Sequence, residues 1–379
     1  MCGRTACTLA PDDVVRACRF QNRQGRSQRP VWKDAPGGQQ YYPSHNIAPA
    51  SHTPVLLSSK HYPGELDSIS ERVVQPMKWG LVPIWHKGDP YKLEYETNNC
   101  RAEGMLTKRT YKVPLEKGQR CVVLADGFFE WKRTKDAKQP YFIYFPHNPD
   151  DVKPQVKTEV DPQSHTEQKP ERKPDPSEAK PELKPDPSEF KPELKTEIKP
   201  DPRDMDKMAV GQKISEEQTG EDEEWHGKPL LKMAGVFEVW HPPDGGPPLY
   251  SYSVITVDAS PAMSWIHHRM PVSMTSCMEN KHPKGPFLTT DEEVRDWLEF
   301  SEVPLSKAAK SIRPTETIQM HMVSSIVNNS RNKSPECVEP YNPKEVKKSA
   351  SSNLMMSWLS KGKKSTSDDS PDAKKKKLN

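Results

Sequence analysis

The sequence has no long apolar run and no Cys-x-x-Cys pair, and each absence excludes a class of protein. No segment approaches the ~18 consecutive apolar residues that a membrane-spanning helix needs, and the N-terminus lacks the charged-then-apolar pattern of a secretory signal. We therefore expect a soluble intracellular protein with no membrane partner. The mean hydropathy of -0.91 indicates that much of the chain cannot form packed core.

The cysteines are odd in number and widely spread, which argues against a disulfide framework and against a structural zinc site. We expect neither a metal nor an organic cofactor. The formal net charge of +3 is too small to indicate nucleic-acid binding, so any such case must come from the local placement of cations. The seven cysteines are Cys2, Cys7, Cys18, Cys100, Cys121, Cys277 and Cys337.

Composition divides the chain into a folded part and two segments that cannot fold alone. Of the 40 prolines, 11 lie between residues 150 and 205 among Lys, Glu and Asp, and from 151 to 224 the only aromatic residue is Phe190. Such a segment buries too little apolar surface to offset its conformational entropy. We predict one domain at 2–340, interrupted by a disordered insertion at about 148–224 and followed by a disordered basic tail at 341–379.

The predicted fold is a β-rich α+β domain with short helices, because most of the apolar runs are short and β-branched. Residues 41–49 contain prolines and are predicted as an ordered surface loop. Helices are predicted at 11–29, opening at 98–103, at 261–266 and at 291–300. Strands are predicted at 54–57, 72–74, 120–125, 128–131, 141–145, 233–240, 250–257 and 318–327.

The first four residues, Met1-Cys2-Gly3-Arg4, offer unusual chemistry. Trimming of Met1 would leave Cys2 with an α-amine beside its thiol, and the amine has a reference pKa near ~8. An aldehyde can form a Schiff base with this amine and then close to a five-membered thiazolidine. Gly3 permits close approach of the backbone to a substrate, and the planar Arg4 guanidinium can donate hydrogen bonds to a carboxylate or phosphate. Taken alone, these residues also fit an ordinary buried cysteine.

Three further polar residues could act with Cys2. Glu130 follows two phenylalanines and precedes a tryptophan, so desolvation would raise its pKa towards a useful general-acid value. His267 stands in His267-His268-Arg269-Met270-Pro271, after a predicted helical turn. Asn99, close to Arg101, could hold a sugar oxygen while the guanidinium holds a phosphate. Each also has a structural explanation, as a salt-bridged glutamate, a packed histidine or a capping asparagine.

The remaining candidates would contact DNA. Arg4, Arg101 and Arg269 would form an anion track, and Asn46 is a further candidate for a DNA contact. Tryptophans would provide faces for unstacked bases, although core packing is the alternative for at least one of them. These tryptophans are Trp79, Trp85 and Trp131.

Five motifs in order give the chain a specific resemblance. They are Met-Cys-Gly-Arg at the start, Trp79–Trp85, Asn99–Glu103, Asp126–Trp131 and His267–Pro271. In this order they resemble the SOS response-associated peptidase family, over residues 2 to about 340 without the insertion. Many family members carry an acidic residue or asparagine after the motif histidine, whereas this chain has His268.

The resemblance implies a trap for abasic sites in single-stranded DNA. Cys2 would attack the ring-opened aldehyde and close to a thiazolidine, giving a covalent DNA–protein cross-link. By motif, Asn99 would orient the Cys2 amine and the sugar, Glu130 would transfer protons and assist slow self-release, and His267 would assist the Schiff base. Arg4 and Arg101 would hold phosphates. The same site would remove Met1 by autoproteolysis.

Two other functions remain open on the sequence. A glutamine amidotransferase, an amidohydrolase with an N-terminal cysteine, also begins Met-Cys-Gly, and a non-covalent reader of modified DNA such as 5-hydroxymethylcytosine would need only the tryptophans and arginines. The run Lys374–Lys377 resembles a nuclear import signal, and 353–359 resembles a degenerate peptide for the replication sliding clamp. We expect a nuclear monomer that acts on chromosomes at replication forks.

Overall fold

The computed structural model describes residues 3–64, 69–135, 137–146, 225–274 and 291–343. Cys2, the insertion and the tail segments at 353–359 and Lys374–Lys377 lie outside these residues. The described chain is β-rich with a few short helices, as predicted. In this part of the chain no helix is long and apolar enough to cross a membrane.

The larger sheet contains a closed ring of strands. Its strands follow the order β14-β13-β12-β9-β6-β7-β4, and β8 also pairs with β13. A parallel pairing of β13 with β7 closes the ring, which consists of β13, β12, β9, β6 and β7. Closing a sheet in this way leaves fewer exposed edges. Its strands are β4 (Val31–Trp32), β6 (His52–Ser58), β7 (Arg72–Trp79), β8 (Asn99–Arg101), β9 (Arg120–Ala125), β12 (Leu231–Trp240), β13 (Leu249–Asp258) and β14 (Arg269–Pro271).

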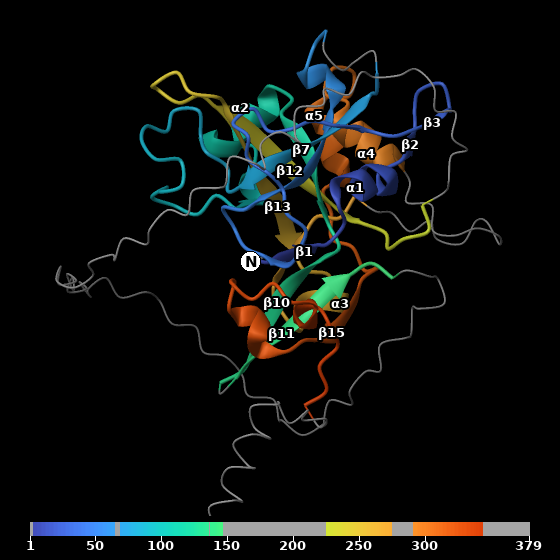
Figure 1. Ribbon diagram of the computed structural model, residues 1–379, viewed down its shortest axis with the longest axis vertical. Coiled ribbons are helices and arrows are strands. Elements are labelled where there is room, and N and C mark those ends of the chain that lie inside the picture. Colours follow the sequence, from blue (N-terminus) through green and yellow to red (C-terminus); the bar gives the residue numbers. More distant parts are fainter. Residues whose placement is uncertain (1–2, 65–68, 136, 147–224, 275–290, 344–379) are drawn as a thin grey trace, which may run out of the picture. The chain divides into compact units, whose positions relative to one another are not determined.

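The smaller sheet carries the beginning of the described chain. Its order is β15-β11-β10-β1-β5, and Figure 1 shows β10, β11 and β15 side by side. A separate hairpin pairs β2 (Phe20–Gln21) with β3 (Ser27–Gln28). The strands of the smaller sheet are β1 (Thr5–Cys7), β5 (Ser44–Ile47), β10 (Gly127–Arg133), β11 (Lys138–Tyr144) and β15 (Gln319–Met322).

Short helices pack around these sheets. The α-helices are α1 (Pro11–Ala17), α2 (Arg109–Glu116), α3 (Pro261–Ser264), α4 (Asp291–Leu298) and α5 (Leu305–Ala308). The 3-10 turns are η1 (Ser59–His61), η2 (Ala102–Gly104), η5 (Ala309–Ser311), η6 (Ser325–Asn328) and η7 (Pro335–Cys337).

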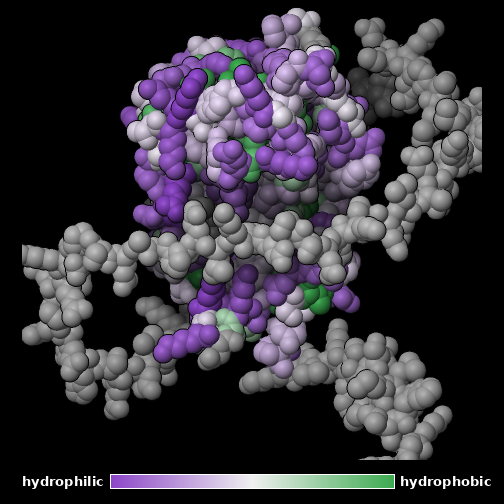
Figure 2. Space-filling view, turned by 90° about the vertical axis from the view of Figure 1, so that its left-hand side faces the viewer, coloured by the Kyte–Doolittle hydropathy of each residue, from purple (hydrophilic) through white to green (hydrophobic). Residues whose placement is uncertain are grey.

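Two hydrophobic clusters stabilise the two sheets. The larger one contains residues from all five strands of the ring and also Trp297 of α4, and within it the Trp79 and Tyr252 rings stack with 6.4 Å between centroids. A smaller cluster, which includes Phe129 and Val327, packs the turns η6 and η7 against the smaller sheet. The face in Figure 2 is mainly hydrophilic outside these clusters, with only small hydrophobic patches.

Four local predictions were wrong. The strand predicted at 318–327 ends at Met322 as β15, and Ser325–Asn328 form the 3-10 turn η6. The helix predicted at 11–29 ends at Ala17, because the Asn22 side chain accepts from the backbone of Gln24 and Arg26 and turns the chain into the β2–β3 hairpin. The predicted loop at 41–49 contains edge strand β5, whose proline neighbours lie outside the paired residues. The helix predicted to open at 98–103 is strand β8, paired in parallel with β13. In this last case, tertiary pairing overrides the local capping signal.

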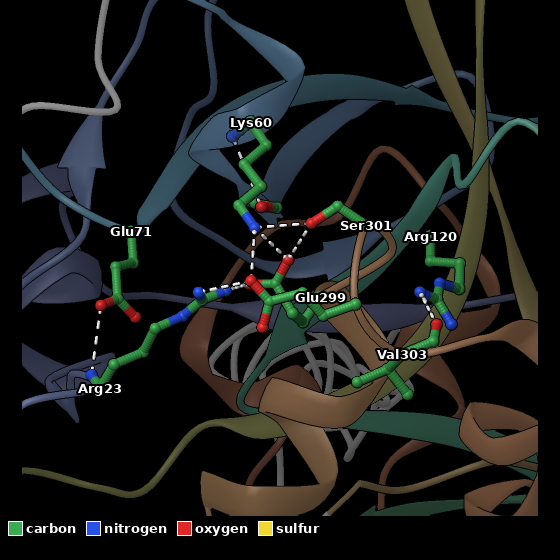
Figure 3. Close-up of polar contacts among 9 residues, drawn as sticks. Arg23, Lys60, Glu71, Arg120, Glu299, Ser301 and Val303 are labelled. Atoms are coloured by element: carbon green, nitrogen blue, oxygen red, sulfur yellow. Dashed lines mark hydrogen bonds and ion pairs between the residues drawn. The ribbon is translucent and has the colours of Figure 1, made fainter.

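An ionic cluster fixes the β2–β3 hairpin to the end of α4. Arg23 binds Glu302 at 2.6 Å and also pairs with Glu299, and Lys60 reaches Glu299 and the Ser301 hydroxyl at 2.6 Å each (Figure 3). Because these side chains are partly exposed, each pair contributes little alone. The network as a whole holds the hairpin, η1 and the segment after α4 together.

Removing the partner of a buried arginine should destabilise the domain far more than removing a surface partner on the same helix. Arg72 is 4% exposed and binds Asp291 through two nitrogens at 2.5 and 2.7 Å. Asp291→Ala should lower the free energy of unfolding by about 3 kcal/mol, because it leaves a buried charge unpaired. Asp296→Ala loses the 3.0 Å ion pair with exposed Lys307 and should lower the free energy of unfolding by less than about 1 kcal/mol. Denaturant unfolding measures both variants. Equal losses would contradict this account.

Candidate active site

Strand β1 places Gly3 and Arg4 beside Glu130. It lies between β10 and β5, with Thr5 opposite Phe128 and Ala6 opposite Gly127. The Phe129 N–H donates to the Arg4 carbonyl at 2.9 Å, which continues this pairing. Extending the antiparallel register by two residues brings Gly3 opposite Glu130. Residue 2, which lies outside the described residues, is covalently joined to this position.

A polar pocket of about 280 Å³ lies where β1 stops and the edge of β10 becomes uncovered. Side chains from both faces of β10 can reach this edge, and a segment after α3 supplies a histidine. The pocket gathers four predicted site residues and three that were not predicted. Its described lining residues are Gly3, Arg4, Glu130, Trp131, Arg133, Lys138, His267 and Asn328.

Glu130 is the only carboxylate among these lining residues. It is 3% exposed, between Phe129 and Trp131 on β10. Burial raises the pKa of Glu130 to about 7, and the backbone hydrogen bond at Trp131 and the nearby His268 oppose this shift only partly. Near neutral pH the carboxyl can therefore both donate and accept a proton.

His267 is held by the chain that follows it. Its Nδ1 lies 3.0 Å from the Arg269 backbone nitrogen and 3.0 Å from the Arg269 carbonyl oxygen. Burial lowers the pKa of His267 below its usual value, so the neutral ring dominates at pH 7. When Nδ1 accepts from the Arg269 N–H, the ring proton is on Nε2. His268 is exposed and does not line the pocket.

Arg4 and Asn46 connect the pocket to the turn η6. One Arg4 nitrogen donates to Asn46 Oδ1 at 2.7 Å and to the Val327 carbonyl at 2.8 Å. The Asn46 side-chain nitrogen donates to the carbonyls of Val327, Asn329 and Asn332 at 3.2, 3.1 and 2.8 Å. Asn46 is fully buried, so it orients Arg4 and the η6 segment and presents no surface to DNA.

Trp131 carries two cations over its ring. The Arg4 guanidinium lies 5.9 Å and the Lys138 ammonium 4.9 Å from the ring centroid. Its Nε1 donates to Asn328 Oδ1 at 2.7 Å. These contacts fix a half-buried aromatic ring in the wall of a cationic pocket.

Burial corrects two further predicted DNA contacts besides Asn46. Trp79 is 1% exposed, and its Nε1 donates to the Asn98 carbonyl at 3.0 Å, so it offers no face to a base. Arg269 is 4% exposed and donates to both Glu103 oxygens, at 3.1 and 2.9 Å, and to Asp258 at 2.7 Å. This guanidinium joins η2 to β13 and β14 and is unavailable to a phosphate.

The other predicted residues lie outside the pocket walls that the described residues form. Asn99 is 8% exposed on β8, and its carbonyl accepts from the Tyr111 hydroxyl at 3.1 Å. Arg101 is exposed on the same strand. Trp85 is half-buried, with the Arg109 guanidinium 4.6 Å from its ring centroid. The structure therefore brings Arg4, Glu130, Trp131 and His267 together but not these three.

Three lining residues were not predicted from the sequence: Arg133, Lys138 and Asn328. Arg133 and Lys138 are directly paired on the β10–β11 hairpin. Both follow the Asp126–Trp131 motif closely in sequence, so a hairpin predicted there could have indicated that they lie near Glu130. Asn328 comes from η6, and nothing local connects it with Trp131. Among the described residues, no group of three or more His, Cys, Asp or Glu could hold a metal ion.

Comparison with known proteins gives a family and close relatives. A family model described as "SOS response associated peptidase (SRAP)" matches residues 1–330. The chain is 43% identical over 382 positions to the Abasic site processing protein HMCES of Gallus gallus, covering 100% of this chain and 89% of that protein. Identity to the Mus musculus protein of the same name is 40% over 382 positions, covering 99% and 86%.

More distant proteins are similar to this chain in sequence or in fold. The Abasic site processing protein YoqW of Bacillus subtilis is 24% identical over 343 positions, covering 90% of this chain and 100% of that protein. A crystal structure of a protein from Bacteroides thetaiotaomicron has a TM-score of 0.52 at 18% identity, covering 90% of this chain and 100% of that chain. The latter likeness supports the architecture alone.

Replacing Glu130 should change how stability depends on pH. The folded-state pKa of about 7 lies above the ordinary value of 4.5, so between these pH values the folded chain binds more protons than the unfolded chain. The contribution of Glu130 to stability is therefore lost as pH rises through this window. Glu130→Gln should gain stability relative to the unchanged protein between pH 5 and pH 8, by up to about 3 kcal/mol. A difference in unfolding free energy that is constant with pH would contradict the buried-acid assignment.

Proposed function

The chain belongs to the SOS response associated peptidase family, and on this premise we propose that it processes abasic sites in single-stranded DNA by covalent capture through Cys2. The observation that carries the proposal is the pocket that joins Gly3, Glu130 and His267. Gly3 in the wall keeps residue 2 within one residue's length of it, ~3.8 Å between Cα atoms. Relatives named for abasic site processing support this choice of substrate.

Capture begins once Met1 has been removed by hydrolysis of the Met1–Cys2 peptide bond, which we assign to the same site. The α-amine of Cys2 then attacks the aldehyde carbon of the ring-opened abasic sugar. Loss of water gives a Schiff base, and the Cys2 Sγ adds to the imine carbon. The thiol proton ends on the nitrogen. One aldehyde and one aminothiol thus give one thiazolidine and one water.

Glu130 transfers the protons of these steps. Burial raises the pKa of Glu130 to about 7, so much of the carboxyl is in its acid form near neutral pH. This acid form protonates the departing hydroxyl when water leaves. Its base form accepts a proton when the amine attacks. The same acid reopens the thiazolidine by protonating the leaving sulfur, which gives slow self-release of the cross-link.

His267 and the pocket cations complete the site. Before the attack, a neutral His267 accepts the extra proton of the Cys2 ammonium group, which leaves the amine uncharged and nucleophilic. Arg133 and Lys138 are exposed and sit in the pocket wall, where they neutralise phosphates, with Arg101 on β8 as a further phosphate contact. Arg4, anchored by Asn46, shapes the wall beside Trp131.

Cys2→Ser should abolish covalent capture and spare non-covalent binding. The serine variant keeps the amine but cannot form a thiazolidine, so the stable adduct with an abasic oligonucleotide should disappear in denaturing electrophoresis. Cys18→Ala, which changes a buried cysteine of the core, is the matched control and should cross-link normally. If the serine variant retains the stable adduct, Cys2 is not the nucleophile. Unmodified protein that binds the oligonucleotide without any adduct would instead favour a non-covalent reader of modified DNA.

The two adjacent histidines should differ sharply. His267→Ala should slow cross-link formation by roughly 100-fold, the scale of a lost proton-transfer group, because His267 lines the pocket. His268→Ala changes an exposed ring outside the pocket walls and should slow it less than about threefold, the scale of a weak electrostatic effect. The measurement is the single-turnover rate of adduct formation, and a reversed order of the two variants would assign the role to His268.

A further inference from the structure

An exposed tryptophan lies two residues before His267. Trp265 caps the C-terminal end of α3 and is 43% exposed, whereas its neighbours Met263 and Ile266 are 0% and 7% exposed. Tryptophan gains more than most residues from burial, so an ordered ring left open beside a candidate active site indicates a ligand surface.

Three contacts hold the Trp265 ring. Its Nε1 donates to the Ala262 carbonyl at 3.0 Å, which satisfies the only polar group of the side chain. Tyr141 meets the ring edge-on, with 5.2 Å between centroids and an interplanar angle of 84°. The Lys132 ammonium lies 4.8 Å from the ring centroid. The indole is therefore oriented before any ligand arrives, and its exposed remainder is an apolar aromatic surface beside a cation.

The β10–β11 register connects this surface with the candidate active site. Glu130 is paired directly with Tyr141, and directly paired residues point to the same side of a sheet. Lys132, two residues beyond Glu130, points to that side as well. Through its contacts with Tyr141 and Lys132, Trp265 therefore lies on the side of the sheet to which Glu130 points. The distance along the strand from Glu130 to Lys132 is ~7 Å, about one nucleotide.

We propose that Trp265, Tyr141 and Lys132 form a subsite that stacks the unpaired nucleobase next to the abasic sugar, while Lys132 moves from the ring to the adjoining phosphate. An abasic site leaves its neighbouring base without one stacking partner, and the indole face replaces it. Aromatic rings combined with cations are the usual means of binding single-stranded nucleic acid without reading its sequence. The inference rests on the proposed function and adds to it a second recognition element, the base beside the lesion.

The test measures stacking directly in the full chain. The probes are single-stranded oligonucleotides with a tetrahydrofuran abasic analogue, which has no aldehyde, and 2-aminopurine on either its 5′ or its 3′ side. Binding should quench 2-aminopurine at one of the two positions. Trp265→Leu, which keeps apolar volume without the ring, should lose this quenching and bind roughly tenfold more weakly. Trp265→Phe, which keeps an aromatic ring, should retain most of the quenching and most of the affinity. Tyr42→Ala, which removes an aromatic residue that is 71% exposed, is the matched control and should behave like the unchanged protein.

A second probe separates stacking from a structural role. When the neighbouring nucleotide also lacks a base, the unchanged protein should bind the oligonucleotide about tenfold more weakly. Trp265→Leu, which has already lost the stacking, should bind this second oligonucleotide little more weakly than it binds the first. The subsite is overturned if Trp265→Leu binds and quenches normally, or if its loss is the same with and without the neighbouring base. Cross-linking to an aldehyde-bearing oligonucleotide distinguishes the two failures: no adduct with the unchanged protein rejects the proposed function, whereas a normal adduct with an unaffected Trp265→Leu rejects only the subsite.

Discussion

The pairing of β1 between β10 and β5 is the constraint on which the candidate site depends. A strand at the edge could fray, but β1 is bonded on both sides and carries the buried residues Thr5, Ala6 and Cys7. Its end is therefore fixed next to Glu130, and Arg4 is fixed again through Asn46 and the carbonyl of Val327. The site is assembled from an N-terminal segment, a central hairpin and the segment after α3 because these pairings bring them together.

Burial supplies the electrostatic asymmetry of the site. Phe129 and Trp131 flank a carboxylate that has little access to water, while Arg133 and Lys138 remain exposed at the rim of the same pocket. Desolvation favours the neutral acid and outweighs the lowering effect of Arg133 on its pKa, while the exposed cations favour an anionic ligand. One small pocket can therefore attract a phosphodiester and still hold a proton donor near neutral pH.

The sequence predicted the strands with continuous apolar runs and the site residues with chemically distinctive neighbours. The run at 120–125 is β9, and the aromatic neighbours of Glu130 indicated the burial that raises its pKa. Burial of Trp79 and the pairing of Arg269 with Glu103 and Asp258 could not be predicted, because they depend on strands distant in sequence. Asn328 and Trp265 were missed for the same reason: their roles come from contacts across the fold with Trp131 and Tyr141.

A titration of the Glu130 carboxyl carbon by ¹³C NMR tests the central claim most directly, with the Glu130→Gln variant identifying the signal. The account predicts a midpoint near pH 7, because the side chain is buried at the end of β1. A midpoint near 4.5, the ordinary value for glutamic acid, would contradict it. That result would mean that the pocket is open to water and that another group supplies the proton.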